Sequence, residues 1–176
     1  MRGGSSKGLF FKSVDLPDSV EEKNQIFLQA LGSPDPYERQ LDGMGGGISS
    51  LSKIAFISLS DHPNADVDYT FGQVAVDQAI VDYRANCGNL SSAVGPFAVD
   101  EGLINTSDGK CLVRIYNTNT KKIIHSYFSV KGGRFNPKGD FVIAGVPGSG
   151  SRIKLEFTDP GGALTGALLP TGKPID

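Results

Sequence analysis

At residues 86–99 the chain reads Asn86-Cys87-Gly88-Asn89-Leu90-Ser91-Ser92-Ala93-Val94-Gly95-Pro96-Phe97-Ala98-Val99, and this stretch decides the fold. The ten residues from 90 to 99 carry no charge, a pattern typical of a helix that is buried on most sides. Cys87 is therefore expected at or just before the helix N-terminus, where free backbone N–H groups and the helix dipole favour an anion. A thiol placed there loses its proton more readily than a free cysteine. The alternative is a structural cysteine, because free cysteine is among the most buried residue types.

The neighbours of Cys87 are suited to a ligand. Gly88 has no side chain to block close approach, and Asn86 and Asn89 place an amide donor on either side of the thiol. The second cysteine, Cys111, begins a predicted strand with no helix behind it, and we interpret it as a core residue. The sequence thus makes Cys87 the candidate reactive thiol.

Lys53 is the second candidate, in the strand predicted over residues 51–59. Alternate residues of a strand share a face, so Lys53 lies on an otherwise apolar face. The opposite face carries Ile54 and Phe56, which indicates a strand buried on both sides. An unpaired buried ammonium is costly, so Lys53 must either reach solvent along its stem or point into a polar site. We favour the polar site.

Two glycine-rich segments complete the candidate site. Gly3-Gly4-Ser5-Ser6 lies between Arg2 and Lys7, and its N–H groups can converge on an anion. The spacing of a nucleotide-binding P-loop is absent, which excludes a nucleotide site of that kind here. A flexible N-terminus is the alternative, although a predicted strand follows at once at residues 9–11. The second segment, Asp42-Gly43-Met44-Gly45-Gly46-Gly47, leads through Ser49 and Ser50 to Lys53.

The remaining pattern predicts an α+β fold, a mixed, barrel-like sheet around one central buried helix. A surface helix is expected to open at Asp18-Ser19 and to end at Gly32. Gly72 is expected to mark a bulge in a strand that begins at Val67. In the strand over 153–157, Ile153, Leu155 and Phe157 are expected to point inward. The other predicted strands cover residues 80–83, 111–116, 122–130 and 141–144, the second and third forming a hairpin.

Composition narrows the function classes. The 176 residues suffice for one domain with a core, and 39% hydrophobic and 20% charged residues are ordinary for a soluble protein. A net charge of −2 gives no basic field for nucleic acid or a membrane surface. Two cysteines make no disulfide framework, and we see neither a signal peptide nor an apolar run near 18 residues, so a cytoplasmic location is expected. No metal-ligand spacing, Ser-His-Asp set or C-x-x-C motif is present, and His62 and His125 are interpreted as structural.

Several motifs together resemble one family. They are Arg2-Gly3-Gly4-Ser5-Ser6-Lys7-Gly8, Gly32-Ser33-Pro34-Asp35-Pro36, Gln40-Leu41-Asp42-Gly43-Met44-Gly45-Gly46, Ser52-Lys53, Asp66-Val67-Asp68-Tyr69-Thr70-Phe71-Gly72-Gln73, Asn86-Cys87-Gly88-Asn89, Asp159-Pro160-Gly161-Gly162 and Leu169-Pro170-Thr171-Gly172. In this order and spacing they are similar to the 2-methylaconitate cis-trans isomerase (PrpF-like) family. Its relatives include 4-oxalomesaconate tautomerase and 3-methylitaconate isomerase.

The resemblance implies a fold like that of diaminopimelate epimerase, with two similar domains and the active site in the cleft between them. It implies no cofactor and a proton shift next to a carboxylate, with the family's cysteine and lysine at Cys87 and Lys53. Family chains are about twice as long, so residues 1–158 are expected to form one N-terminal domain. Residues 159–176, rich in Gly, Pro and Thr, are expected to link it to a second. Two departures are Ser5, where the family usually has Thr, and the lack of a strand before Arg2.

The expected function is isomerisation or tautomerisation of a small unsaturated di- or tricarboxylate. The expected substrate-binding residues are Arg2, Gly4, Ser5, Ser6, Ser49, Ser50, Asn86, Gly88 and Asn89. Two alternatives stay open, a non-catalytic carboxylate-binding half-domain or inactive fragment, and an amino-acid epimerase of the same fold. The epimerase needs a second cysteine facing Cys87, for which Cys111 is a poor candidate. An exposed cleft wall also offers a surface for a homodimer.

Overall fold

A mixed β-sheet forms the body of the molecule in the computed structural model, which describes residues 1–159, 161, 167, 169 and 171–174. The strands are β1 (Arg2–Gly3), β2 (Ser6–Lys12), β3 (Lys53–Leu59), β4 (Val67–Val74), β5 (Val81–Asp82), β6 (Gly109–Asn117), β7 (Lys122–Lys131), β8 (Arg134–Phe135) and β9 (Lys154–Phe157). Their order is β1-β2-β3-β4-β6-β7-β8, with β5 paired to β4 and β9 paired to β7. The pairs β2–β3 and β4–β6 are parallel, and the other pairs are antiparallel. The mixed sheet expected from the sequence is therefore confirmed.

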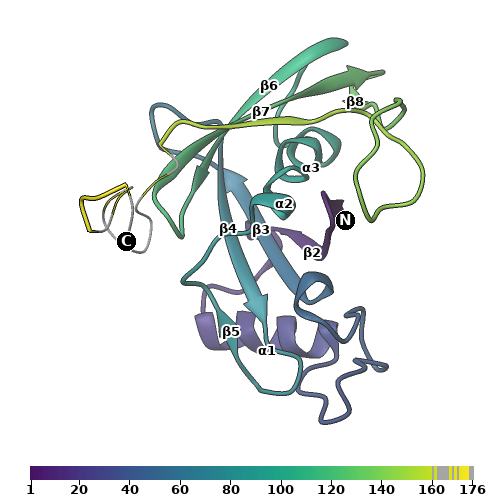
Figure 1. The fold of residues 1–176 in the computed structure, drawn as a ribbon, viewed down its shortest axis with the longest axis vertical. Coiled ribbons are helices and arrows are strands. Elements are labelled where there is room, and N and C mark those ends of the chain that lie inside the picture. Colours follow the sequence, from purple (N-terminus) through teal and green to yellow (C-terminus); the bar gives the residue numbers. More distant parts are fainter. Residues whose placement is uncertain (160, 162–166, 168, 170, 175–176) are drawn as a thin grey trace.

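Helical segments cover both faces of this sheet. They are the α-helices α1 (Val20–Leu31), α2 (Gly88–Ser91) and α3 (Val94–Asp100) and the 3-10 turns η1 (Ser13–Asp15) and η2 (Ser49–Leu51). The sheet curls around α2 and α3, while α1 lies outside the curl beside β5 (Figure 1). A large apolar cluster joins α2 and α3 to the inner face, and a smaller one joins Phe27 and Leu31 of α1 to Ile54 and Val74. β3 thus contributes to both clusters, which explains its apolar residues on both faces.

The limits of α1 follow from its capping residues. The Ser19 side chain accepts a hydrogen bond from the Glu22 backbone N–H at 3.3 Å and so caps the first turn. Gly32 ends the helix with φ 76°, a left-handed conformation that glycine adopts without a Cβ clash. The helix predicted from residue 18 to Gly32 is therefore confirmed.

The buried helix after Cys87 was predicted as one element and is in fact two, separated at Ser92 and Ala93. Proline has no N–H to donate to the carbonyl four residues earlier, and its ring clashes with that carbonyl in a continuous helix. In one continuous helix, the ring of Pro96 would clash with the carbonyl of Ser92. In the structure Pro96 lies in the first turn of α3, where a missing N–H donor has no cost. Gly95 is required there, because a Cβ would lie 2.6 Å from Cε1 of Phe128.

Three strand details predicted from the sequence are wrong. Gly72 pairs with Ile54 in unbroken register, without a bulge, and a Cβ on it would lie 2.6 Å from Ile54 Cδ1. Residues 141–144 form a loop with one bridge, from Phe141 to Gly150, because they lie on a Gly- and Pro-rich excursion with no neighbouring strand. Phe157 is 38% exposed at the end of β9, although Ile153 and Leu155 are partly buried as expected.

The hairpin of β6 and β7 is confirmed, with Gly109 opposite Val130 and Asn117 opposite Lys122. Cys111 is 7% exposed in the large core cluster, as predicted. Asp159 forms an ion pair with Lys122. Most of the linker predicted over 159–176 lies outside the described residues, so that assignment stays a prediction. Within the part of the chain that the structure describes, no helix is long and apolar enough to cross a membrane.

Candidate functional site

The glycine-rich N-terminal loop packs directly on the start of α2. A Cβ on Gly3 would lie 2.5 Å from the Asn89 carbonyl oxygen, and a Cβ on Gly4 would lie 2.4 Å from Asn89 Oδ1. Gly4 also has φ 53°, a left-handed conformation that favours glycine. Asn89 Nδ2 donates to Ser5 Oγ at 3.2 Å, which ties the loop to the helix. Two glycines therefore allow this contact, a role beyond the anion binding predicted for the loop.

Cys87 lies at the N-cap of α2, as predicted from the sequence. Its Sγ accepts a hydrogen bond from the Leu90 N–H at 3.4 Å and donates one to Ser6 Oγ at 3.6 Å. The thiol is partly buried, and Ser6 is 4% exposed. Gly88 leaves space beside it, since the nearest atom to a Cβ there would be Phe157 Cζ at 3.8 Å. The structure thus joins Cys87 to Ser6 of the N-terminal loop.

Lys53 points to a polar contact, the outcome favoured from the sequence. It begins β3, is 8% exposed, and donates from Nζ to Gln73 Oε1 at 2.5 Å. The ammonium also lies 5.4 Å from the centroid of the Phe71 ring, within the range of a cation–π contact. Ser49 joins this group through its backbone, because its carbonyl accepts from Gln73 Nε2 at 3.1 Å.

Three other residues predicted for the site have the following surroundings. Asn86 is turned toward α2 and the sheet, because its Oδ1 accepts from Ser91 Oγ at 3.3 Å and from Asn117 Nδ2 at 3.4 Å. The Arg2 guanidinium is exposed and donates to the Gly4 carbonyl at 2.7 Å. Ser50 lies in η2, half-buried, in the segment that precedes Lys53.

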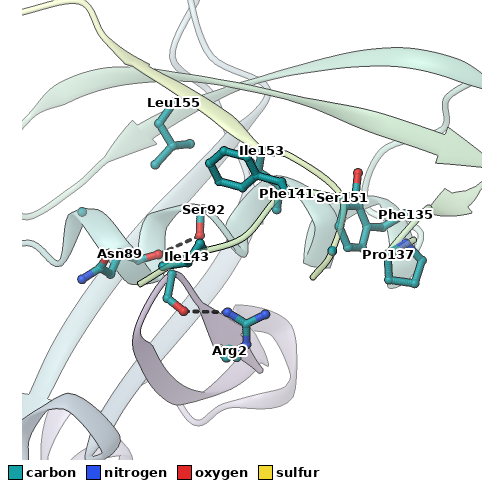
Figure 2. A pocket seen from close by; sticks show the side chains of 13 residues that line it. Arg2, Asn89, Ser92, Phe135, Pro137, Phe141, Ile143, Ser151, Ile153 and Leu155 are labelled. Carbon is teal, nitrogen blue, oxygen red and sulfur yellow. Dashed lines mark hydrogen bonds between the residues drawn. The ribbon is translucent and has the colours of Figure 1, made fainter. Parts of the chain in front are cut away.

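A cavity of about 330 Å³ opens beside the N-terminal loop. Four predicted residues line it, namely Arg2, Gly4, Gly88 and Asn89. Its opposite wall is largely apolar and comes from β8, β9 and the segment between them, with Phe135, Pro137, Phe141, Ile143, Ile153 and Leu155. Figure 2 shows Arg2 on one side and Phe141, Ile153 and Leu155 on the other. Neither Cys87 nor Lys53 is among the described residues that line this cavity.

A model of the PrpF protein family matches the chain over residues 1–176. The chain belongs to the PrpF family. This PrpF-family chain is 46% identical over 176 residues to the 3-methylitaconate isomerase of Eubacterium barkeri, covering 100% of the chain and 46% of that relative. It is 43% identical over 187 residues to the 2-methyl-aconitate isomerase of Cupriavidus necator, covering 100% of the chain and 47% of that relative.

Among solved structures, the crystal structure of methylitaconate-delta-isomerase matches the PrpF-family chain with a TM-score of 0.91 at 46% identity. The match covers 99% of this chain and 45% of that one. The chain therefore spans about half the length of the curated relatives it matches.

Sequence reasoning missed two further polar residues near the site of the PrpF-family chain. Gln73 belongs to one of the family motifs, and its position opposite Lys53 follows only once β3 and β4 are paired. Tyr69 is fully buried, and its hydroxyl lies against Ser91 without a well-aligned hydrogen bond. Burial raises the pKa of the Tyr69 phenol, so this group stays neutral. The apolar wall of the cavity carries no signal in the sequence, because it depends on the path of a loop.

Proposed function

We propose that this chain carries the reactive cysteine and lysine of an isomerase or tautomerase of small unsaturated di- or tricarboxylates. The relatives whose names specify methylitaconate and methyl-aconitate isomerases support this class of reaction. The observation that carries the proposal is Cys87, whose Sγ contacts both the Leu90 N–H and the Ser6 hydroxyl at the start of α2. Arg2, Gly4 and Asn89 lie in the adjoining cavity, where a carboxylate finds a guanidinium and an amide.

The chemistry requires a carbanion next to a carboxylate to be stabilised. Its negative charge spreads into the carboxyl group and must meet donors that are already in place. Ser5 and Asn89 offer such donors on the loop side, and Lys53 adds a positive charge. Cys87 takes or returns a proton.

The proposal extends to the architecture. The sheet curled around α2 and α3 is one lobe of a diaminopimelate epimerase-like fold, and residues 159–176 lead toward a second lobe. The length of the relatives, about twice that of this chain, supports a second lobe in the family. Substrate then binds against Cys87 and is enclosed from the other side.

A carboxylate-binding half-domain without catalysis is the second candidate. One observation favours it, because the described cavity is lined by Arg2 and Asn89 but by neither Cys87 nor Lys53. Epimerisation of an amino acid is not supported, since it requires a second thiol opposite Cys87. Cys111, the other cysteine of the chain, is buried in the core.

Solvent deuterium exchange tests the proposal. The chain is incubated in deuterium oxide with 2-methylaconitate or a related acid, and incorporation into carbon-bound positions is followed by mass spectrometry. We expect slow but measurable incorporation with the wild type, and a loss of at least about 100-fold from that rate in Cys87→Ala and in Lys53→Met. Cys111→Ala is the matched control, which is expected to lose stability but retain exchange. Exchange that persists in Cys87→Ala would refute the proposal, and binding without any exchange would favour the half-domain.

A further inference from the structure

Lys53 and Gln73 are direct cross-strand partners. Lys53 on β3 is opposite Gln73 on β4, and Gln73 is opposite Asp82 on β5. Residues directly opposite in antiparallel strands project their side chains from the same face of the sheet. Gln73 therefore separates the ammonium of Lys53 from the carboxylate of Asp82. The residue opposite Lys53 on its other side, Gly8 of β2, has no side chain.

The orientation of the Gln73 amide is fixed by the backbone carbonyl groups around it. Its Nε2 donates to the carbonyl oxygens of Ser52 at 2.9 Å and of Ser49 at 3.1 Å. The reversed amide would place its oxygen against these two carbonyls and its NH2 group against the ammonium. Oε1 must therefore face Lys53, and it accepts from Nζ at 2.5 Å. The position of the lysine head is thus set by an amide that is itself anchored to the segment before β3.

The hydrogen-bond partner of Lys53 is neutral, so the positive charge of the ammonium is not cancelled by that partner. Among the described residues, no carboxylate lies within ion-pair distance of Nζ. Asp82, one strand away, is bonded to Arg84 at 2.7 Å, and this contact lowers the pKa of Asp82 to about 2. The contacts recorded for Nζ among the described residues are with the Gln73 amide and the Phe71 ring. An amide and a ring hold the ammonium without neutralising its charge.

We propose that Gln73 is a positioning residue that holds the Lys53 ammonium in place and leaves its charge available to an anionic ligand. The proposal rests on the proposed function only in assigning Lys53 to the substrate site. A carboxylate at position 73 would pair with the ammonium and cancel its charge. An apolar residue of similar length would release it.

Competitive acetylation tests the proposal on the chain itself. Trace labelling with acetic anhydride at pH 8, followed by complete labelling of the unfolded protein and mass spectrometry, gives the reactivity of Lys53 relative to the exposed Lys138. We expect Gln73→Met to raise this ratio at least about fivefold, because the amine loses its acceptor. We expect Gln73→Glu to lower it at least about threefold, because a carboxylate favours the charged, unreactive form.

Changes of opposite sign in the reactivity of Lys53 in the two variants distinguish a positioning role of Gln73 from a packing role. Loss of packing alone would raise the reactivity of Lys53 in both variants, and no change in either would equally overturn the proposal. If Gln73→Met does not fold, as judged by its melting temperature, Gln73→Glu alone decides by its sign. Gln25→Met and Gln25→Glu, on the exposed face of α1, are the matched controls and should leave the ratio unchanged. The readout involves no turnover, so a negative exchange experiment would reject the isomerase but not the role of Gln73.

Discussion

Two cysteines of the chain lie in contrasting surroundings. Cys87 is partly buried at the start of α2, whereas Cys111 is 7% exposed within β6. We predict that iodoacetamide alkylates Cys87 at least about tenfold faster than Cys111, because access and local donors control thiol reactivity. A time course with peptide mapping by mass spectrometry measures both rates. Equal rates, or faster labelling of Cys111, would count against Cys87 as the reactive thiol.

Gly3 is a second residue at which the structure predicts the effect of a substitution, in this case on stability. Its missing side chain allows β1 to touch α2, and a Cβ there would lie 2.5 Å from a backbone oxygen that has no freedom to move aside. We predict that Gly3→Ala lowers the free energy of unfolding by about 2 kcal/mol, since overpacking at backbone is relieved only by shifting an element. Urea denaturation measures the loss. Gly150→Ala is the control, because its Cβ would meet its nearest atom at 3.4 Å; equal losses in both variants would show that the contact is not tight.

At the scale of elements, an ion pair links Asp66, the residue before β4, to Arg114 of β6. Arg114 donates to Asp66 from its backbone N–H at 2.7 Å and from Nη2 at 2.6 Å. Burial would raise the pKa of Asp66, but the hydrogen bonds from Arg114 outweigh it and hold that pKa below its usual range. The stabilisation is therefore present above about pH 4, the pKa of an unfolded aspartate, and is lost as the pH falls through the lower folded value.

The variant Arg114→Met should reveal this pH dependence. We predict a loss of about 1 kcal/mol in the free energy of unfolding at pH 7, a modest figure because the pair is partly solvated, and a smaller loss at pH 3. Urea denaturation at the two pH values measures it, with the exposed Arg134→Met as control. A loss of the same size at both pH values would contradict an ionic origin.

Elements with a strong local signal were predictable from the sequence. The cap at Ser19, the stop at Gly32 and the alternation of the β6–β7 hairpin each depend on neighbours in the chain. The break before Pro96 also has a local cause, the proline itself, but the uncharged run on both sides of it is typical of one continuous buried helix. Gly72 could not be interpreted correctly from sequence, because the atom that requires a glycine there belongs to Ile54 on another strand.

The candidate site was also predictable only where its residues have a local signal in the sequence. Cys87 at a helix start and Lys53 at a strand start follow from local pattern, and both positions are as expected. The contact of Cys87 with Ser6 joins residues 81 positions apart, and the apolar wall of the cavity depends on the path of a loop. The sequence pattern predicts a sheet around the helix, but it does not specify which distant side chains that sheet brings into contact.

At the scale of the whole molecule, the proposed site is open on one side. The cavity beside Arg2 is exposed, and proton removal next to a carboxylate needs developing charge to be met from several sides in a site that excludes water. We predict that this chain alone binds a polycarboxylate but turns it over at least about 100-fold more slowly than a relative of full length. Absorbance assays on both proteins measure the ratio. Comparable turnover would show that one lobe is sufficient.

An NMR titration of the chain with trans-aconitate tests most directly whether the loop before β2, the start of α2 and Lys53 form one polycarboxylate site. Amide chemical shifts are followed in the wild type and in Lys53→Glu, which reverses the charge of the proposed lysine. We expect saturable shifts in the wild type at Gly4–Ser6, at Gly88–Leu90 and at Lys53, and their loss in the variant. Shifts that are confined to other surfaces, or that persist unchanged in Lys53→Glu, would contradict the account.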